Sequence, residues 1–207
     1  NLGKIKFLTG EYEEARAIFE EVITQNDKIV AAYDWLAKIH EKYGDLPAAQ
    51  KVLQSAIAIS PKAILRQQVL GDVAYRNGDL TVAEQSFKEA VKQGKHSVFK
   101  KPTDYTTLAK VLADRNAPEA SLNVLIDGGK EFLDNPQAAL EISVQEVLAL
   151  KKLKRGKEAG KAMERVSRLS SKHTEKLPIS TELQLAKALS LMGDEANGQA
   201  MVKRLIQ

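Results

Sequence analysis

The sequence predicts an all-α solenoid of about six stacked, antiparallel helix pairs, and two observations lead to that fold class. The first is a period of 34 residues, a length typical of arrays in which each repeat is one supersecondary unit. The second is composition: 43% hydrophobic residues suffice for a continuous core, while 5% aromatics, 12 Gly and 6 Pro argue against a β-sandwich, a barrel or a disordered chain. The repeated sets are Gly10, Gly44 and Gly78; Ala15, Ala49 and Ala83; Phe19, Leu53 and Phe87; and Val22, Ala56 and Ala90.

Three repeats follow the period closely, at residues 1–29, 30–63 and 64–97. Their helices are expected at 1–9 and 12–26, 30–43 and 46–59, and 62–77 and 80–94. A glycine closes each first helix because it tolerates a left-handed backbone, and Asp45 and Asp79 are suited to cap second helices. Where the two helices of a pair approach most closely, we expect small residues on both sides: Gly3 against Ala15, Ala37 against Ala49, and Gly71 against Ala83.

Beyond residue 94 the strict period fails, and three further pairs rest on helical periodicity. They span 98–135, 136–178 and 179–207, with helices expected at 103–115 and 118–133, 136–154 and 157–172, and 179–192 and 195–206. The fourth turn, RNAPEA, is interpreted as one residue shorter than the earlier turns, with Ala120 at the small position. The fifth pair is expected to turn at Gly156 and the sixth at Gly193. All six pairs are expected to form one domain, 1–207.

Motifs for catalysis, cofactors and metals are missing from the sequence. The absence of cysteine excludes disulfides and thiolate metal sites. No phosphate-binding loop, G-x-S-x-G elbow or H-E-x-x-H motif occurs, and the three histidines, His40, His96 and His173, are far apart. We therefore predict a protein that is not an enzyme and uses no cofactor or metal.

The ends of the chain and its hydropathy bear on location. No apolar run approaches the roughly 18 residues that suggest a membrane span, and no signal-peptide pattern opens the chain. We expect a cytoplasmic protein without a membrane span. The first residue is Asn and the first repeat begins partway through its first helix, so we also expect further sequence on the N-terminal side.

The net charge of +4 is unevenly distributed, since residues 151–176 hold ten Lys or Arg against three Glu. A solvated helix face is the simplest interpretation. An acidic partner, a lipid surface or a nucleic acid is the alternative. Nucleic acid is the least favoured of these because the stretch has no aromatic residue on which a base could stack.

The repeat residues together resemble the tetratricopeptide repeat family. The resemblance is carried by Gly3, Gly10, Tyr12, Ala15, Phe19 and Val22; by Tyr33, Leu36, Ala37, Gly44, Asp45, Ala49, Leu53, Ala56 and Pro61; and by Leu70, Gly71, Gly78, Asp79, Ala83, Phe87 and Ala90. It implies a right-handed superhelix whose first helices line a concave groove for a protein or peptide partner. A narrower resemblance, over 32–80 and 95–112, is to the repeat region of bacterial response regulators, in which a receiver domain precedes the repeats. It implies a role in two-component signalling, and a generic adaptor or assembly factor without a receiver domain is the alternative.

Groove residues are expected on the first helix of each pair, with a mixture of charges that suits an extended peptide better than a polyanion. They are Lys4, Phe7, Leu8, Asp34, Lys38, Glu41, Lys42, Gln68, Asp72, Tyr75, Arg76, Thr106 and Lys110.

Two further expectations concern partners. Family members that hold acidic chaperone tails use a clamp of Lys, Asn and Arg, but the matching positions here are Asn1, Lys4, Trp35, Leu65 and Val69, so such tails are disfavoured. Trp35 is expected in the core. An apolar patch at Ile5, Phe7 and Leu8 predicts a weak homodimer of the chain.

Overall fold

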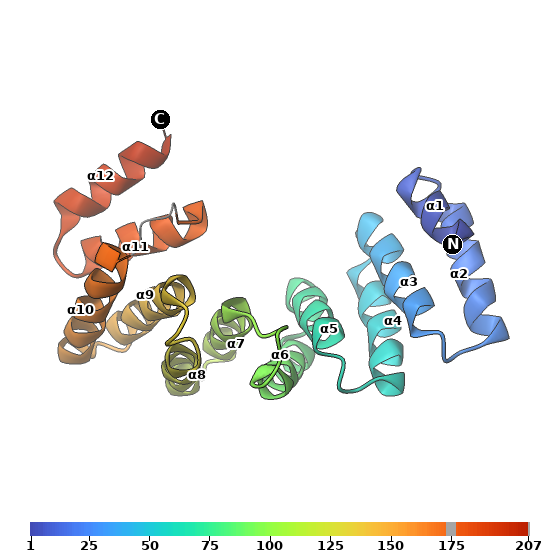
Figure 1. Cartoon of the computed structure of the whole chain (residues 1–207), viewed down its shortest axis with the longest axis horizontal. Coiled ribbons are helices and arrows are strands. Elements are labelled where there is room, and N and C mark those ends of the chain that lie inside the picture. The colour runs from blue at the N-terminus through green and yellow to red at the C-terminus, as the bar shows by residue number, and fades with distance from the viewer. Residues whose placement is uncertain (173–176, 207) are drawn as a thin grey trace. The chain divides into compact units, whose positions relative to one another are not determined.

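The computed structural model describes residues 1–172 and 177–206, and these contain twelve α-helices and no strand. The helices follow one another as six antiparallel pairs (Figure 1). Contacts group the chain into two units, Asn1–Lys100 (unit 1) and Lys101–Gln207 (unit 2). The boundary lies in the connection where the strict 34-residue period ends.

Unit 1 contains the three regular pairs: α1 (Leu2–Leu8) with α2 (Tyr12–Gln25), α3 (Val30–Lys42) with α4 (Leu46–Ile59), and α5 (Ile64–Arg76) with α6 (Leu80–Gly94). The observed helix ends lie within two residues of the predicted ones. Asp45 and Asp79 cap α4 and α6 as predicted, each accepting a hydrogen bond from the amide three residues on, at 3.0 and 3.1 Å. Glu11 makes no such cap and instead binds Lys6.

The close approach within these pairs also involves a large side chain of the second helix. A Cβ atom built on Gly3 would lie 2.8 Å from the ring of Phe19, and one on Gly71 would lie 2.7 Å from the ring of Phe87. Each glycine therefore makes room for an aromatic ring of the partner helix. In the second pair Ala37 shares a cluster with Ala49, its expected partner, and with Leu53, which is smaller than phenylalanine.

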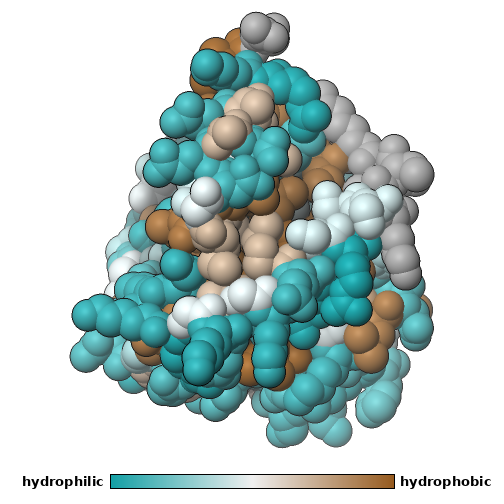
Figure 2. Space-filling view, turned by 90° about the vertical axis from the view of Figure 1, so that its left-hand side faces the viewer, coloured by the Kyte–Doolittle hydropathy of each residue, from teal (hydrophilic) through white to brown (hydrophobic). Residues whose placement is uncertain are grey.

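Unit 2 contains α7 (Pro102–Asp114) with α8 (Pro118–Glu131), α9 (Pro136–Lys152) with α10 (Gly156–Lys172), and α11 (Ile179–Leu191) with α12 (Glu195–Ile206). Its core runs from Leu122 on α8 through Leu140, Val144 and Val147 on α9 to Leu185 on α11. Figure 2 looks onto the side where the C-terminal helices lie and shows a hollowed strip of hydrophobic residues framed by hydrophilic ones. A cavity of about 360 Å³ between α11 and α12 is lined by Leu183, Ala186, Val202 and their neighbours.

Two turns in unit 2 correct the sequence interpretation. The fourth turn is not shortened: Asn116, with φ 60°, takes the place that glycine holds in unit 1. The small buried residue of that pair is consequently Ser121, while Ala120 is exposed. In the fifth turn the left-handed residue is Lys154, with φ 59°, and Gly156 is the first residue of α10. Gly193 turns the sixth pair as predicted, with φ 97°.

Candidate partner-binding site

The predicted groove residues of unit 1 lie on its three first helices, α1, α3 and α5. Lys4 is exposed on α1, and Lys38 and Lys42 are exposed on α3. Asp34, Glu41 and Tyr75 are partly buried, and Asp72 and Arg76 are exposed. Thr106 and Lys110 lie on α7, in unit 2, where the Thr106 hydroxyl donates to the Thr103 carbonyl at 3.3 Å.

Ion pairs join α3 to α5 at two levels. At one end the Arg66 guanidinium donates two hydrogen bonds to the Asp34 carboxylate, at 2.8 and 2.9 Å. At the other end one nitrogen of Arg76 lies 2.6 Å from Glu41 and 3.2 Å from Asp72. These carboxylates raise the pKa of both guanidinium groups, Arg66 through its bond to Asp34 and Arg76 chiefly through its bond to Glu41. The surface formed by the first helices of unit 1, called the first-helix face below, therefore carries paired charges at two levels.

Arg66 is the residue of this face that sequence reasoning missed. A usable signal was present, because Asp34 and Arg66 are 32 residues apart and Glu41 and Arg76 are 35 apart, both near the repeat period. In a stack of repeats, residues about one period apart lie on neighbouring helices. Opposite charges at such a spacing therefore predict interhelical pairs.

An aromatic cluster supports the α3 part of the face. Trp35 stacks on Phe19, with ring centroids 6.0 Å apart, and contacts Phe7 at 5.2 Å. The Lys38 ammonium lies over the Trp35 ring, 4.3 Å from its centroid, where the negative face of the ring attracts a cation. Trp35 thus packs between the first two pairs, in agreement with its expected core role. Phe7 belongs to the same cluster and is partly buried, so it contributes less open surface than expected.

Gln68 faces the connection that follows α6. Its side chain is 8% exposed, and its amide nitrogen donates to the Phe99 carbonyl at 3.1 Å. This bond ties α5 to the segment before unit 2 begins. The residue therefore presents little surface to a partner.

The basic stretch is partly neutralised by nearby carboxylates. Arg155 contacts Glu119 at 2.9 Å and Glu158 at 2.6 Å, and Arg165 contacts Glu146 at 2.7 Å. Lys152, Lys157 and Lys161 are exposed. Residues 173–176, with His173 and Lys176, lie outside the described part of the chain.

No arrangement typical of a metal or catalytic centre is found among the described residues. No three His, Cys, Asp or Glu side chains converge there to hold a metal ion. His40 lies 3.8 Å from the Asp45 carboxylate, on a partly exposed surface. In the same described part, every helix is too short or too polar to cross a membrane.

Comparisons with known proteins agree with the repeat pattern. A protein-family model described as tetratricopeptide repeat matches residues 6–73, which run from α1 into α5. No curated protein matches the chain by sequence.

Solved structures share the architecture over most of the chain. MamA matches with a TM-score of 0.66 and 16% identity, over 83% of this chain and 96% of its own. Pseudomonas aeruginosa pilF matches with a TM-score of 0.64 and 14% identity, over 99% of this chain and 87% of its own. YrrB, a TPR protein with an unusual peptide-binding site, matches with a TM-score of 0.56 and 16% identity, over 91% of this chain and 90% of its own. At these identities the likeness concerns the fold alone.

Proposed function

We propose that this chain, which carries tetratricopeptide repeats, is a non-catalytic scaffold that holds a segment of a partner protein against the first-helix face of unit 1. The contacts come from α1, α3 and α5. The residues assigned to binding are Lys4, Asp34, Lys38, Glu41, Lys42, Asp72, Tyr75 and Arg76, and Gln68 is left out because it is buried. The peptide-binding site of its structural neighbour YrrB supports this assignment at the level of the fold.

The single observation that carries the proposal is the pattern of charge between α3 and α5. Asp34 is paired with Arg66, and Glu41 and Asp72 share Arg76, while Lys38 and Lys42 stand exposed beside them. A uniformly acidic strand would meet three carboxylates on this face, and a uniformly basic one would meet the lysines. A peptide of mixed charge avoids both penalties.

Thr106 and Lys110 are proposed as additional contacts because they lie on α7, the first helix of the fourth pair. Their contribution is tested separately, by Lys110→Glu. Loss of partner binding in that variant supports a contact on unit 2 itself. Unchanged binding removes Lys110 from the assignment.

Crosslinking tests the proposal directly. A photo-crosslinking amino acid in place of Lys38, on α3, should capture a partner in cells. The same amino acid in place of Lys51, exposed on the second helix α4, serves as the control. Mass spectrometry identifies the captured chain. Equal capture from both positions would contradict the assignment of the face.

Charge reversal then tests the captured partner with purified protein. Lys38→Glu with Lys42→Glu should weaken its binding and lower the thermal melt only slightly, because both side chains are exposed and only Lys38 gives up a contact, the one with the Trp35 ring. Arg76 is a poorer choice for reversal because Arg76→Glu would bring a third carboxylate beside Glu41 and Asp72. If binding is instead lost on reversing Lys151, Lys152, Lys154 and Arg155, the functional surface is the basic stretch.

The cellular role that we propose is the output region of a cytoplasmic two-component response regulator, on the basis of the narrower sequence resemblance. The alternative is an adaptor or assembly factor without a receiver domain. The sequence encoded upstream of residue 1 distinguishes them. A receiver domain there supports the first role, and its absence supports the second.

Two further proposals concern a second copy of the chain and nucleic acid as partners. The exposed apolar residues Leu2, Ile5 and Leu8 on α1 favour a weak homodimer, which sedimentation velocity over a concentration series would detect. A strict monomer at high concentration would remove it. Nucleic acid is disfavoured because the face has mixed charge, and we expect no measurable binding to duplex DNA at physiological salt.

A further inference from the structure

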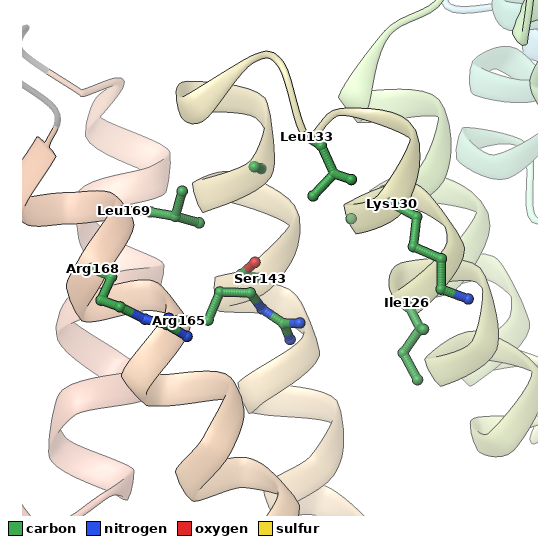
Figure 3. Close-up of a pocket in the computed structure, with 9 residues that line it drawn as sticks. Ile126, Lys130, Leu133, Ser143, Arg165, Arg168 and Leu169 are labelled. Atoms are coloured by element: carbon green, nitrogen blue, oxygen red, sulfur yellow. The ribbon is translucent and has the colours of Figure 1, made fainter.

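A second groove lies in unit 2, between the second helices of the fourth and fifth pairs. Its cavity of about 350 Å³ lies over α9 and between α8 and α10. Figure 3 shows Arg165, Arg168 and Leu169 on one side, Ile126, Lys130 and Leu133 on the other, and Ser143 between them. The volume is within the range of roughly 300–1,000 Å³ that is common for ligand sites in proteins.

The groove continues along one stripe of α9. Ala139 and Ser143 form its floor at the first cavity, and Glu146 and Leu150 continue it into a second cavity of about 260 Å³. Ile126 and Arg165 line both cavities, so the two are neighbours. The groove can therefore take several successive side chains of an extended or helical segment.

The charge around this groove is predominantly positive. Glu146, buried on α9, accepts a hydrogen bond from Arg165 at 2.7 Å, which fixes that guanidinium over the floor. Glu158 is held by two hydrogen bonds from Arg155. Lys130 contacts only the exposed Asp127 among the described residues, a surface pair worth little. Arg168 and Lys161 are exposed. The pKa of Glu158 is lowered chiefly by its hydrogen bonds from Arg155 and also by the nearby Lys161. Among the described residues Arg168 has no carboxylate partner.

The corresponding groove of unit 1 has a more polar lining. It lies over α5 and between α4 and α6, with a volume of about 520 Å³. Four glutamines line it: Gln54, Gln67, Gln85 and Gln93. Apolar residues and lysines occur there too, namely Ile57, Leu70, Val82, Lys62 and Lys92. The unit 2 cavities differ in that no glutamine of the described residues lines them, and Leu133 at their rim is left 74% exposed. An apolar floor with cations at its rim is complementary to apolar side chains flanked by carboxylates.

We propose that the groove over α9 is a second docking site, which binds an acidic amphipathic segment of a partner protein. Leucine-like side chains of the segment enter the cavities beside Ile126 and Leu169. Its carboxylates pair with Lys130 and Arg168 at the rim. This site uses the second helices of unit 2, so it is separate from the face assigned above in unit 1.

Two short, fluorescein-labelled peptides test this site with the whole purified chain. One alternates Glu-Glu with Leu-Leu pairs, and the other has Lys in place of every Glu. Fluorescence anisotropy should show binding of the acidic peptide alone. Equal binding of the basic peptide would overturn the charge complementarity on which the site rests.

Variants locate the binding. Lys130→Glu with Arg168→Glu should weaken the binding of the acidic peptide by about tenfold or more, which corresponds to about 1.4 kcal/mol or more of binding free energy. Leu133→Glu, at an exposed apolar position of the rim, should weaken it as well. Lys157→Glu is the control for charge reversal, because it reverses one positive charge on α10 outside the groove. Since these positions are at the surface, circular dichroism melts should match those of the parent chain.

Three further outcomes of these experiments distinguish the groove from other binding sites. Unchanged affinity in the groove variants, or an equal loss in Lys157→Glu, would show that the peptide binds elsewhere. Binding to phosphatidylglycerol vesicles that depends on Lys130 and Arg168, with no peptide binding, would assign the groove to a lipid surface and overturn the proposal. Lys38→Glu with Lys42→Glu should leave the peptide affinity unchanged, so a failure of the unit 1 site and a failure of this site are distinguishable.

Discussion

The six turns inside the helix pairs share one backbone geometry but differ in sequence between the two units. Unit 1 uses Gly10, Gly44 and Gly78, whereas the first two turns of unit 2 use Asn116 and Lys154. The hydrogen bond that closes the turn is nevertheless the same: the amide of Asp45 donates to the His40 carbonyl at 2.9 Å, and that of Arg155 donates to the Leu150 carbonyl at 2.9 Å. A left-handed residue followed by this bond is the Schellman end of a helix. The packing of the helices can therefore impose the turn where glycine is absent.

Aligning the pairs on these turns also changes the description of unit 2. The left-handed residues are spaced 34 and 34 residues apart through unit 1, and then 38, 38 and 39. The fifth residue after each one is small throughout: Ala15, Ala49, Ala83, Ser121, Ala159 and Gly198. The repeat signature thus persists in unit 2 with a longer period. Part of the added length is in α9, which has 17 residues where α3 has 13.

The largest expected effect tests the close approach that is particular to unit 1. Gly71→Ala should cost about 1–3 kcal/mol of unfolding free energy, because its Cβ would overlap the buried ring of Phe87. Phe87→Leu in the same chain should recover much of the loss, since it imitates the second pair, with Ala37 and Leu53. Urea denaturation measures both. Purely additive losses would show that the two residues are not coupled.

Helix capping gives the next effect. Asp79→Ala should cost about 1 kcal/mol, because the Asp79 carboxylate caps α6 and also accepts from Gln50 at 2.8 Å. Ala117→Asp should stabilise the uncapped α8 of unit 2 by a comparable or smaller amount.

The contribution of Asp79 should depend on pH. Hydrogen bonds from the Val82 amide and Gln50 lower its pKa in the folded chain. Stability from this group is therefore present above the unfolded pKa and is lost as the pH falls through the folded one. Thermal melts of the parent and Asp79→Ala should converge in acid. A constant difference across the pH range would contradict the capping role of the charge.

Turn substitutions test the unit comparison most directly. Lys154→Gly should stabilise the chain by about 1 kcal/mol or less, because it relieves a left-handed lysine but adds freedom to the unfolded state. Asn116→Gly should stabilise the chain less, since asparagine tolerates a left-handed backbone better than lysine does. Gly44→Lys is the reverse change in unit 1 and should destabilise. Equal melting temperatures for all three variants would show that the residue type at a left-handed turn position does not affect stability.

The smallest effect concerns Glu141 on α9. Burial raises the pKa of its carboxyl, so the folded chain binds this proton more tightly than the unfolded chain does. The associated stability is present below the unfolded pKa and is lost as pH rises through the folded one. Glu141→Gln should raise Tm by about 1 °C at neutral pH and leave it unchanged near pH 3. A destabilised Gln variant at neutral pH would contradict this.

Most of the helices were predictable because their signals are local. Asp45 and Asp79 mark helix starts, and glycine marks the ends of first helices in unit 1. The phase of the fourth pair was misread because Ala120 resembles a small core residue and Asn116 does not resemble glycine. Side-chain pairing was harder to predict: Arg66 is not adjacent in sequence to Asp34, and only the packing of the second helix pair against the third brings them together.

The longer α9 indicates that the fold accommodates one kind of length change. Four residues add about one helical turn, about 6 Å, and leave every side chain facing nearly its former direction. An insertion of two residues would rotate the following side chains by about 200° and expose the buried face. Insertions and deletions in this chain should therefore be accepted in whole turns. Helix length then becomes a variable that can widen a binding surface without rebuilding the core beneath it.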